Sequence, residues 1–211
     1  MAIRVFVADD HPVVRDGVRF ALRNEAPGIE VVGEATNGAD VLERAAKGGI
    51  DVYVMDVTMP RLNGVETARR LRRILPDARV ILLTMHNSAR LVADAMAVGV
   101  LGYVLKDAMA GELTKAIKAA AEGKSYLGQG VPVPPAEASR RRGESSLALS
   151  EREAEVLQLI AEGLSSKEIA DRTGLTFNTV NVHRRNIMQK LGLHKDTELV
   201  RYAISEGRAK L

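Results

Sequence analysis

Cysteine is absent from the 211 residues, and no apolar run approaches the roughly 20 residues that a membrane-spanning helix needs. Without cysteine the chain has neither disulfides nor thiolate metal ligands, which fits a reducing compartment. The first ten residues, MAIRVFVADD, reach two carboxylates too early for a secretory signal peptide. We therefore expect a cytoplasmic protein that has no membrane partner.

An excess of charge of one sign is also missing. The net charge is +3, which is too small to indicate a nucleic-acid partner by itself. The distribution is more informative, because residues 172–195 contain basic side chains and no acidic one: Arg172, Arg184, Arg185, Lys190 and Lys195. This predicts a locally positive surface in the C-terminal part, either for phosphate backbones or as a solvated helix face. The length suits two small domains better than one core.

Five apolar runs rich in β-branched residues alternate with five helical patterns in the first 125 residues. The runs cover residues 3–8, 29–35, 52–56, 79–84 and 100–105. Such alternation with short connections predicts an α/β doubly wound, flavodoxin-like domain over residues 1–125, with a five-stranded parallel sheet and helices on both faces.

The stretch IDVYVMDVTMPRLNG, residues 50–64, brings Asp56 to the C-terminal end of the third strand. We expect strands one, three and five to lie side by side at the centre of the sheet. Polar residues at strand ends would then converge at one edge: Asp9, Asp10, Asp56, Lys106 and, next to them, Thr84. Each alone could be a cap or a surface residue, but their joint occurrence predicts a site.

Three neighbouring carboxylates repel one another unless a cation lies between them. Oxygen ligands favour a hard divalent ion, and we expect Mg²⁺. Such a pocket suits phosphoryl transfer onto Asp56, with the Lys106 ammonium and the Thr84 hydroxyl stabilising charge on the phosphoryl oxygens.

Periodicity disappears after the α/β pattern, where proline, glycine and serine accumulate. We expect a linker over residues 126–148. Residues 149–211 then predict a separate all-α domain of four helices. Ser150 and Glu153 have the spacing of a capping box, and a short glycine-containing turn at 173–176 joins the middle two helices, as in a helix-turn-helix unit.

The helix predicted from Asn178 to Leu191 has an apolar side and a polar side. Val180, Ile187 and Leu191 are spaced to face the core. The other side presents the candidate DNA contacts: Thr179, Asn181, Val182, His183, Arg184, Arg185 and Lys190. Asparagine and arginine read adenine and guanine in the major groove, whereas threonine and lysine suit phosphates. We expect Asn181 and Arg185 to contribute most to sequence preference.

The first 125 residues resemble the receiver domain of two-component response regulators. The string LSEREAEVLQLIAEGLSSKEIADRTGLTFNTVNVHRRNIMQKL, residues 149–191, is similar to the LuxR-type signature of the NarL/FixJ subfamily. Three positions depart from the pattern. Met85 stands where a smaller residue is common, Asp107 where many receivers have proline, and Asn181 where family members usually have lysine, so base preference is not carried over.

This resemblance implies roles for the pocket residues. Asp56 would be the phosphoacceptor, Asp10 a direct Mg²⁺ ligand, Asp9 a ligand through water, and Thr58 a ligand through its carbonyl. Lys106 would pair with the phosphoryl group, and Thr84 with Tyr103 would form the switch pair. It also implies three partners: a histidine kinase, double-stranded DNA, and a second copy of the chain that dimerises through the helix starting at Asp196.

We therefore expect a transcription factor activated by phosphorylation of Asp56, and no enzyme in its own right. Three alternatives remain open. The same architecture could act unphosphorylated as a constitutive dimer. A Mg²⁺-dependent phosphatase using an aspartyl phosphate would carry a carboxylate two residues after the nucleophile, where this chain has Thr58. A small-molecule-sensing LuxR-type factor would need an apolar pocket in place of a charged one.

Overall fold

The computed structural model describes residues 2–85, 88–133, 149–193 and 195–205. The chain divides into two compact units, Met1–Arg140 and Arg141–Leu211. Each unit has its own buried apolar core. Among the described residues, no helix combines the length and the apolar character required to cross a membrane.

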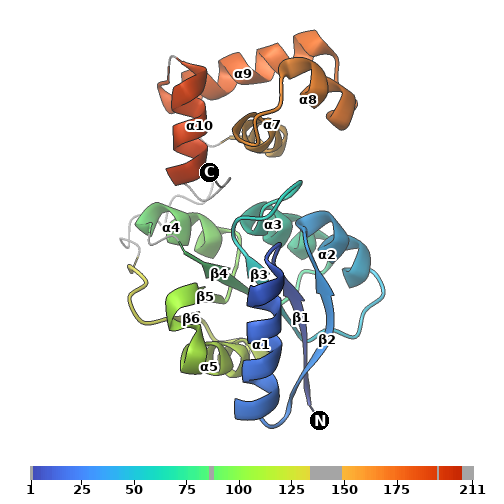
Figure 1. Cartoon of the computed structure of the whole chain (residues 1–211), viewed down its shortest axis with the longest axis vertical. Coiled ribbons are helices and arrows are strands. Elements are labelled where there is room, and N and C mark those ends of the chain that lie inside the picture. The colour runs from blue at the N-terminus through green and yellow to red at the C-terminus, as the bar shows by residue number, and fades with distance from the viewer. Residues whose placement is uncertain (1, 86–87, 134–148, 194, 206–211) are drawn as a thin grey trace. The chain divides into compact units, whose positions relative to one another are not determined.

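The first unit is built on one parallel sheet in the order β2-β1-β3-β4-β5-β6 (Figure 1). Every neighbouring pair of strands is parallel. The strands are β1 (Ile3–Ala8), β2 (Ile29–Ala35), β3 (Val52–Asp56), β4 (Val80–Thr84), β5 (Gly102–Leu105) and β6 (Tyr126–Leu127). Strands β3 and β4 are buried throughout, which explains why their sequences are apolar without alternation.

Helices cover both faces of this sheet, as the alternating pattern predicts (Figure 1). They are α1 (Pro12–Glu25), α2 (Gly38–Ala45), α3 (Gly64–Ile74), α4 (Ala89–Ala97) and α5 (Met109–Ala121), and a 3-10 turn, η1 (Lys106–Ala108), precedes α5. Apolar residues of α1 and α5 pack on one face, where Leu22 and Ile117 are buried. Residues of α2, α3 and α4 pack on the other, where Val41, Leu71 and Val92 are buried.

Two expectations about the sheet are wrong. The sheet has six strands and not five, because Tyr126–Leu127 pairs with β5. The linker expected over 126–148 therefore starts too early. The strand was not predicted because two residues are too few to show a strand periodicity. Tertiary contacts hold β6 in place: the Tyr126 hydroxyl donates to Glu112 of α5 at 2.7 Å, and Val131 nearby in the chain is buried. The rest of that linker, 134–148, lies outside the described residues.

The strand order also differs, because β4 lies between β3 and β5. The two central strands are thus β3 and β4, with β1 and β5 on either side of them. The register places Asp56 beside Leu83, one residue before Thr84.

The turn after Asp56 is tightly packed. A Cβ atom on Gly64 would lie 2.2 Å from the Asp56 carbonyl oxygen, so only glycine fits there. Asn63 caps α3 by accepting from the Glu66 amide at 2.9 Å. Arg61 in the same turn has φ 66°, which is the left-handed region. The residues of this turn thus determine the conformation of the loop that follows Asp56.

The described residues of the second unit form four helices: α7 (Glu151–Ala161), α8 (Ser166–Thr173), α9 (Phe177–Leu191) and α10 (Asp196–Ser205). Ser150 with Glu153 and Ser165 with Glu168 form complete capping boxes at α7 and α8. Gly174 ends α8 with φ 67°, and a short turn leads into α9. The core contains Leu157, Ile169, Val180, Ile187 and Leu199.

Candidate functional site

Three carboxylates converge at the C-terminal edge of the parallel sheet. Asp9 and Asp10 follow β1, and Asp56 ends β3. Asp9, Asp10, His11 and Asp56 each offer one ligand atom, and these atoms lie within 4.8 Å of one another. Asp9 and Asp56 are 0% and 2% exposed. The predicted convergence of these acids is confirmed, although the strand order that produces it differs from the expected one.

Lys106 compensates the two buried acids. Its Nζ lies 2.6 Å from Oδ2 of Asp9 and 2.9 Å from Oδ2 of Asp56, and its side chain is 9% exposed. Burying a carboxylate without a counter-charge is costly, so this lysine stabilises both acids at once. Lys106 starts η1 directly after β5 and reaches the pocket past the end of β4.

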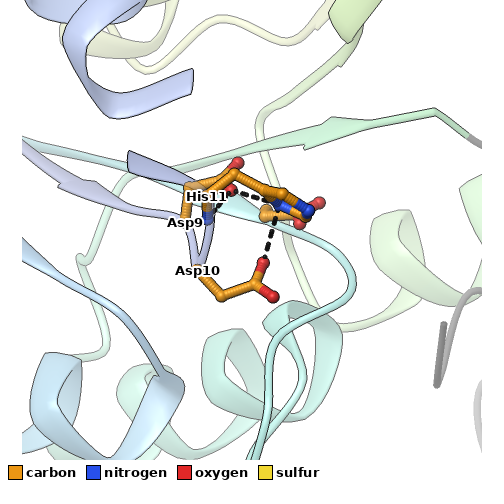
Figure 2. A group of neighbouring side chains, drawn as sticks. Asp9, Asp10 and His11 are labelled. Carbon is orange, nitrogen blue, oxygen red and sulfur yellow. Dashed lines mark hydrogen bonds and ion pairs between the residues drawn. The ribbon is translucent and has the colours of Figure 1, made fainter. Parts of the chain in front are cut away.

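His11 is a pocket residue that was not among the candidates predicted from the sequence. Figure 2 shows its ring beside Asp9 and Asp10. Nδ1 lies 3.2 Å from Oδ1 of Asp9 and 3.0 Å from Oδ1 of Asp10, while the side chain is half exposed. The His11 backbone amide also donates to Oδ1 of Asp9 at 2.9 Å. Its position directly after two aspartates was the available signal.

Arg15 supports the pocket from α1 and was also missed. Its Nη1 donates to the Asp9 carbonyl oxygen at 2.7 Å, and its Nε donates to Glu34 of β2 at 3.0 Å. Burial tends to raise the pKa of Glu34, but hydrogen bonds from Arg19 and Arg15 outweigh it and hold that pKa below its usual value. This network fixes the backbone that carries the first two carboxylates.

The hydroxyl residues expected to switch lie on the adjacent strands. Thr84 ends β4 and is completely buried, and Tyr103 of β5 is buried as well. Burial raises the pKa of the Tyr103 phenol, and the neighbouring Thr84 side chain counteracts only part of that rise. The ring thus occupies an interior position. Thr58, two residues beyond Asp56, is 4% exposed.

Carboxylate oxygens dominate this pocket, which is the ligand type that hard divalent cations prefer. Lys106 is already paired with two of the acids, and the accessible side of the group is formed by Asp10 and His11. The arrangement combines the buried Asp56 carboxylate, a cationic side chain in contact with it and a set of oxygen donors. Chemically this suits transfer of an anionic group onto Asp56.

In the second unit, helix α9 separates the predicted core residues from a solvent-facing side. Val180 and Ile187 are completely buried, as their spacing predicts. Val182 and Phe177 are 48% and 53% exposed, and Asn178 and Arg185 are exposed. Phe177 was not among the candidates, although it stands at the first position of the helix. Exposed apolar and basic side chains therefore share this side of α9.

Other candidate DNA contacts are engaged within the domain. Nζ of Lys190 lies 2.7 Å from Oε2 of Glu153 on α7. Nη2 of Arg184 donates to Asp196 at the start of α10 at 2.8 Å, and the Arg184 side chain is only 16% exposed. Nδ1 of His183 is buried and has no hydrogen-bond partner among the residues described. The side chains of Lys190 and Arg184 thus form ion pairs within the domain, and His183 packs within it. The sequence pattern, which predicted all three as DNA contacts, did not indicate these internal positions.

Two protein families match this chain over separate ranges. Residues 5–118 match the family described as response regulator receiver domain. Residues 147–203 match the family described as bacterial regulatory proteins, luxR family. The two ranges correspond to the α/β unit and to the helical unit.

Relatives match this chain over nearly the whole length of both sequences. The transcriptional regulatory protein MctR of Rhizobium johnstonii is 38% identical over 205 residues, covering 97% of this chain and 94% of the relative. The response regulator UvrY of Escherichia coli is 36% identical over 208 residues, covering 97% and 95%.

Solved structures of RcsB resemble the chain as well. One from Salmonella typhimurium has a TM-score of 0.69 at 31% identity and covers 97% of this chain and 98% of that one. Another is described as RcsB bound to promoter rprA in the presence of phosphomimetic BeF3−, with a TM-score of 0.66 at 27% identity over 97% and 99% of the two chains. From the two domain matches and the full-length relatives, this chain belongs to the response regulators of the NarL/FixJ subfamily, in which a receiver domain precedes a LuxR-type helix-turn-helix domain.

Proposed function

We propose that Asp56 is the phosphoacceptor of a DNA-binding transcription factor that phosphorylation activates. The observation that carries this proposal is the contact of the Lys106 ammonium with the buried Asp56 carboxylate, 2.9 Å apart, in a pocket of oxygen donors. A carboxylate oxygen of Asp56 attacks the phosphorus of a phosphorylated histidine in a partner kinase, or of a small acyl phosphate. The new O–P bond forms as the donor's bond to phosphorus breaks, and the leaving group keeps the electron pair.

The pocket fits a divalent cation, because its donors are carboxylate oxygens within 4.8 Å of one another. Asp10 and Asp56 would hold Mg²⁺ directly, Asp9 through water, and Thr58 through its carbonyl oxygen. When bound, the ion supplies positive charge to the oxygens of the transferred group. Lys106 contributes a second positive charge from its position between Asp9 and Asp56, and Arg15 holds the backbone of Asp9.

Phosphorylation adds about −1.5 to −2 charges next to Lys106 and Thr84. Thr84 is buried at the end of β4 beside Tyr103, so a shift of its hydroxyl toward the phosphoryl oxygens would disturb the packing of this ring. We propose that this movement is the switch, and that it alters the β4, β5 and α4 side of the receiver domain. If the two conformations of a receiver differ in free energy by only a few kcal/mol, such contacts are strong enough to change which conformation predominates.

The output of the switch is DNA binding through α9. RcsB, a structural neighbour, is described in complexes with DNA, including two RcsB dimers bound to two parallel DNAs. For this chain we propose that it binds DNA as a homodimer in the cytoplasm, where the chromosome lies. The side chains that contact DNA would be Thr179, Asn181, Val182 and Arg185. Arg184 and Lys190 are bound to Asp196 and Glu153, so for them we propose a role in orienting α9.

The decisive test is phosphorylation by acetyl phosphate with Mg²⁺, measured by intact-protein mass spectrometry. We expect the unaltered chain to gain one phosphoryl group and Asp56→Asn to gain none. Asp51→Asn is the matched control, since Asp51 precedes the same strand at its other end and accepts a hydrogen bond from the Arg4 amide. Equal labelling of Asp56→Asn and the unaltered chain would contradict the assignment of Asp56 as the phosphoacceptor.

A further inference from the structure

Two adjacent serines at the start of α8 have different partners. Ser165 caps the helix: its hydroxyl accepts from the Glu168 amide, and Oε2 of Glu168 accepts from the Ser165 amide at 2.8 Å. Ser166 is partly buried and reaches across to α9, where its Oγ lies 2.9 Å from Oδ1 of Asn181. One serine is thus committed to its own helix and the other to the DNA-facing helix.

The Ser166 hydroxyl belongs to a chain of polar contacts through three helices. Nη1 of Arg184 donates to Oγ of Ser166 at 3.4 Å, and Nη2 of Arg184 donates to Asp196 at 2.8 Å. Arginine only donates hydrogen bonds. The Ser166 oxygen therefore accepts from Arg184, and its single proton is available to the carbonyl oxygen of Asn181.

In the structure the Ser166 hydroxyl donates this proton to the side chain of Asn181. Its oxygen faces Ser166, and its amide nitrogen has no hydrogen-bond partner within the part of the chain that the structure describes. A carboxamide reads adenine bidentately only when its oxygen and its nitrogen both point at the base edge. With the oxygen bonded to α8, Asn181 has N–H donors to offer to DNA.

We infer that Ser166 is a positioning residue for base recognition, which turns Asn181 so that it donates to DNA and selects bases with acceptors in the major groove. The inference rests on the proposed role of α9 as the DNA-reading helix. Guanine, adenine and thymine each present an acceptor there, whereas cytosine presents only its N4 donor. On the DNA strand that Asn181 contacts, this position should therefore exclude cytosine, because the acceptors of a C·G pair belong to the guanine of the other strand.

The test is selection of binding sites from a randomised duplex library by the full chain treated with acetyl phosphate and Mg²⁺. Asn181→Ala identifies the contacted position as the one whose preference disappears. In Ser166→Ala the side-chain amide of Asn181 is free to rotate, so its oxygen and nitrogen can both point at a base. We therefore expect adenine to be enriched at the contacted position and the exclusion of cytosine to weaken by about five- to tenfold. Ser166→Thr keeps the hydroxyl and should keep the original preference.

Ser165→Ala is the matched control, because it removes a hydroxyl from the neighbouring residue. We expect it to lower the thermal midpoint of the helical unit and to leave the selected sequence unchanged. The inference is overturned if Ser166→Ala selects the original sequence, if it weakens all sequences equally, or if Ser165→Ala changes the preference as strongly. If the unaltered chain selects no sequence at all, the proposed role of α9 itself fails.

Discussion

Lys106 shows how strongly single residues in the pocket depend on one another. Its ammonium lies within 3 Å of two carboxylates whose side chains are 1% and 3% exposed. Removing one partner from a buried ionic group leaves the others uncompensated, which costs more than the pair contributes when intact. The pocket is therefore also a source of instability, which we expect a bound cation to relieve.

We expect Lys106→Met to lower the free energy of unfolding by roughly 3 kcal/mol without divalent ions. Mg²⁺ should stabilise this variant more than the unaltered chain, because the ion replaces the missing positive charge near Asp9 and Asp56. Urea unfolding with and without Mg²⁺ measures both effects. Lys124→Met, which removes an exposed ion pair with Glu122, is the control and should behave as the unaltered chain. Equal Mg²⁺ effects in all three proteins would contradict the argument.

Arg15 and Arg19 allow a comparison between two arginines of one helix. Both pair with Glu34, but only Arg15 also donates to the Asp9 carbonyl oxygen. We expect Arg15→Ala to slow phosphorylation by acetyl phosphate by about tenfold, since it releases the backbone that positions Asp9 and Asp10. Arg19→Ala should leave the initial rate unchanged. If both substitutions slow the reaction equally, the relevant feature is charge near Glu34 and not the contact with Asp9.

At the scale of elements, Glu153 joins two helices of the DNA-binding domain. It completes the capping box of α7, where its Oε2 accepts from the Ser150 amide at 2.7 Å, and it pairs with Lys190 near the end of α9. Burial tends to raise the pKa of Glu153, but hydrogen bonds from Lys190 and Ser150 outweigh it and hold the pKa below 4.5.

This depressed pKa predicts how the domain responds to acid. A carboxyl group with a lower pKa in the folded state contributes stability that is present above about pH 4.5 and is lost as the pH falls through the folded-state pKa. We expect Glu153→Gln to reduce the acid-dependent loss of stability of the helical unit. Urea unfolding followed by circular dichroism at about pH 6 and about pH 3.5 tests this. Glu151→Gln removes a carboxylate from the same helical turn and should retain the original pH dependence.

At the scale of the whole molecule, the two units have separate buried cores, and we expect phosphorylation of the first unit to change DNA binding by the second. As a dimer on DNA, the chain should protect two half-sites whose centres are about 10 base pairs, or a multiple of this spacing, apart. We expect acetyl phosphate to increase DNA affinity in footprinting and to have no effect on Asp56→Asn. Equal affinity with and without the donor would support the constitutive dimer in place of the switch.

Local patterns predicted most of the architecture and much of the site. Runs such as VYVMD mark buried strands because they are apolar throughout, and Ser150 with Glu153 marks a helix start because both groups satisfy free backbone amides within one turn. The convergence of Asp9, Asp10 and Asp56 follows from parallel strands that share one edge. The two-residue β6 escaped detection, since its pairing with β5 and its contact with Glu112 involve residues far away in the sequence.

The amino-acid sequence by itself determined the two domains, the alternation of strands and helices, and the acids at the strand ends, because periodicity, caps and turn residues act over a few neighbouring positions. The tertiary structure alone decided that β4 lies between β3 and β5, that Lys106 contacts both Asp9 and Asp56, and that Arg184 and Lys190 are bound within their domain. These outcomes depend on distances between side chains that are remote in the sequence, and such distances are set only when the elements pack together.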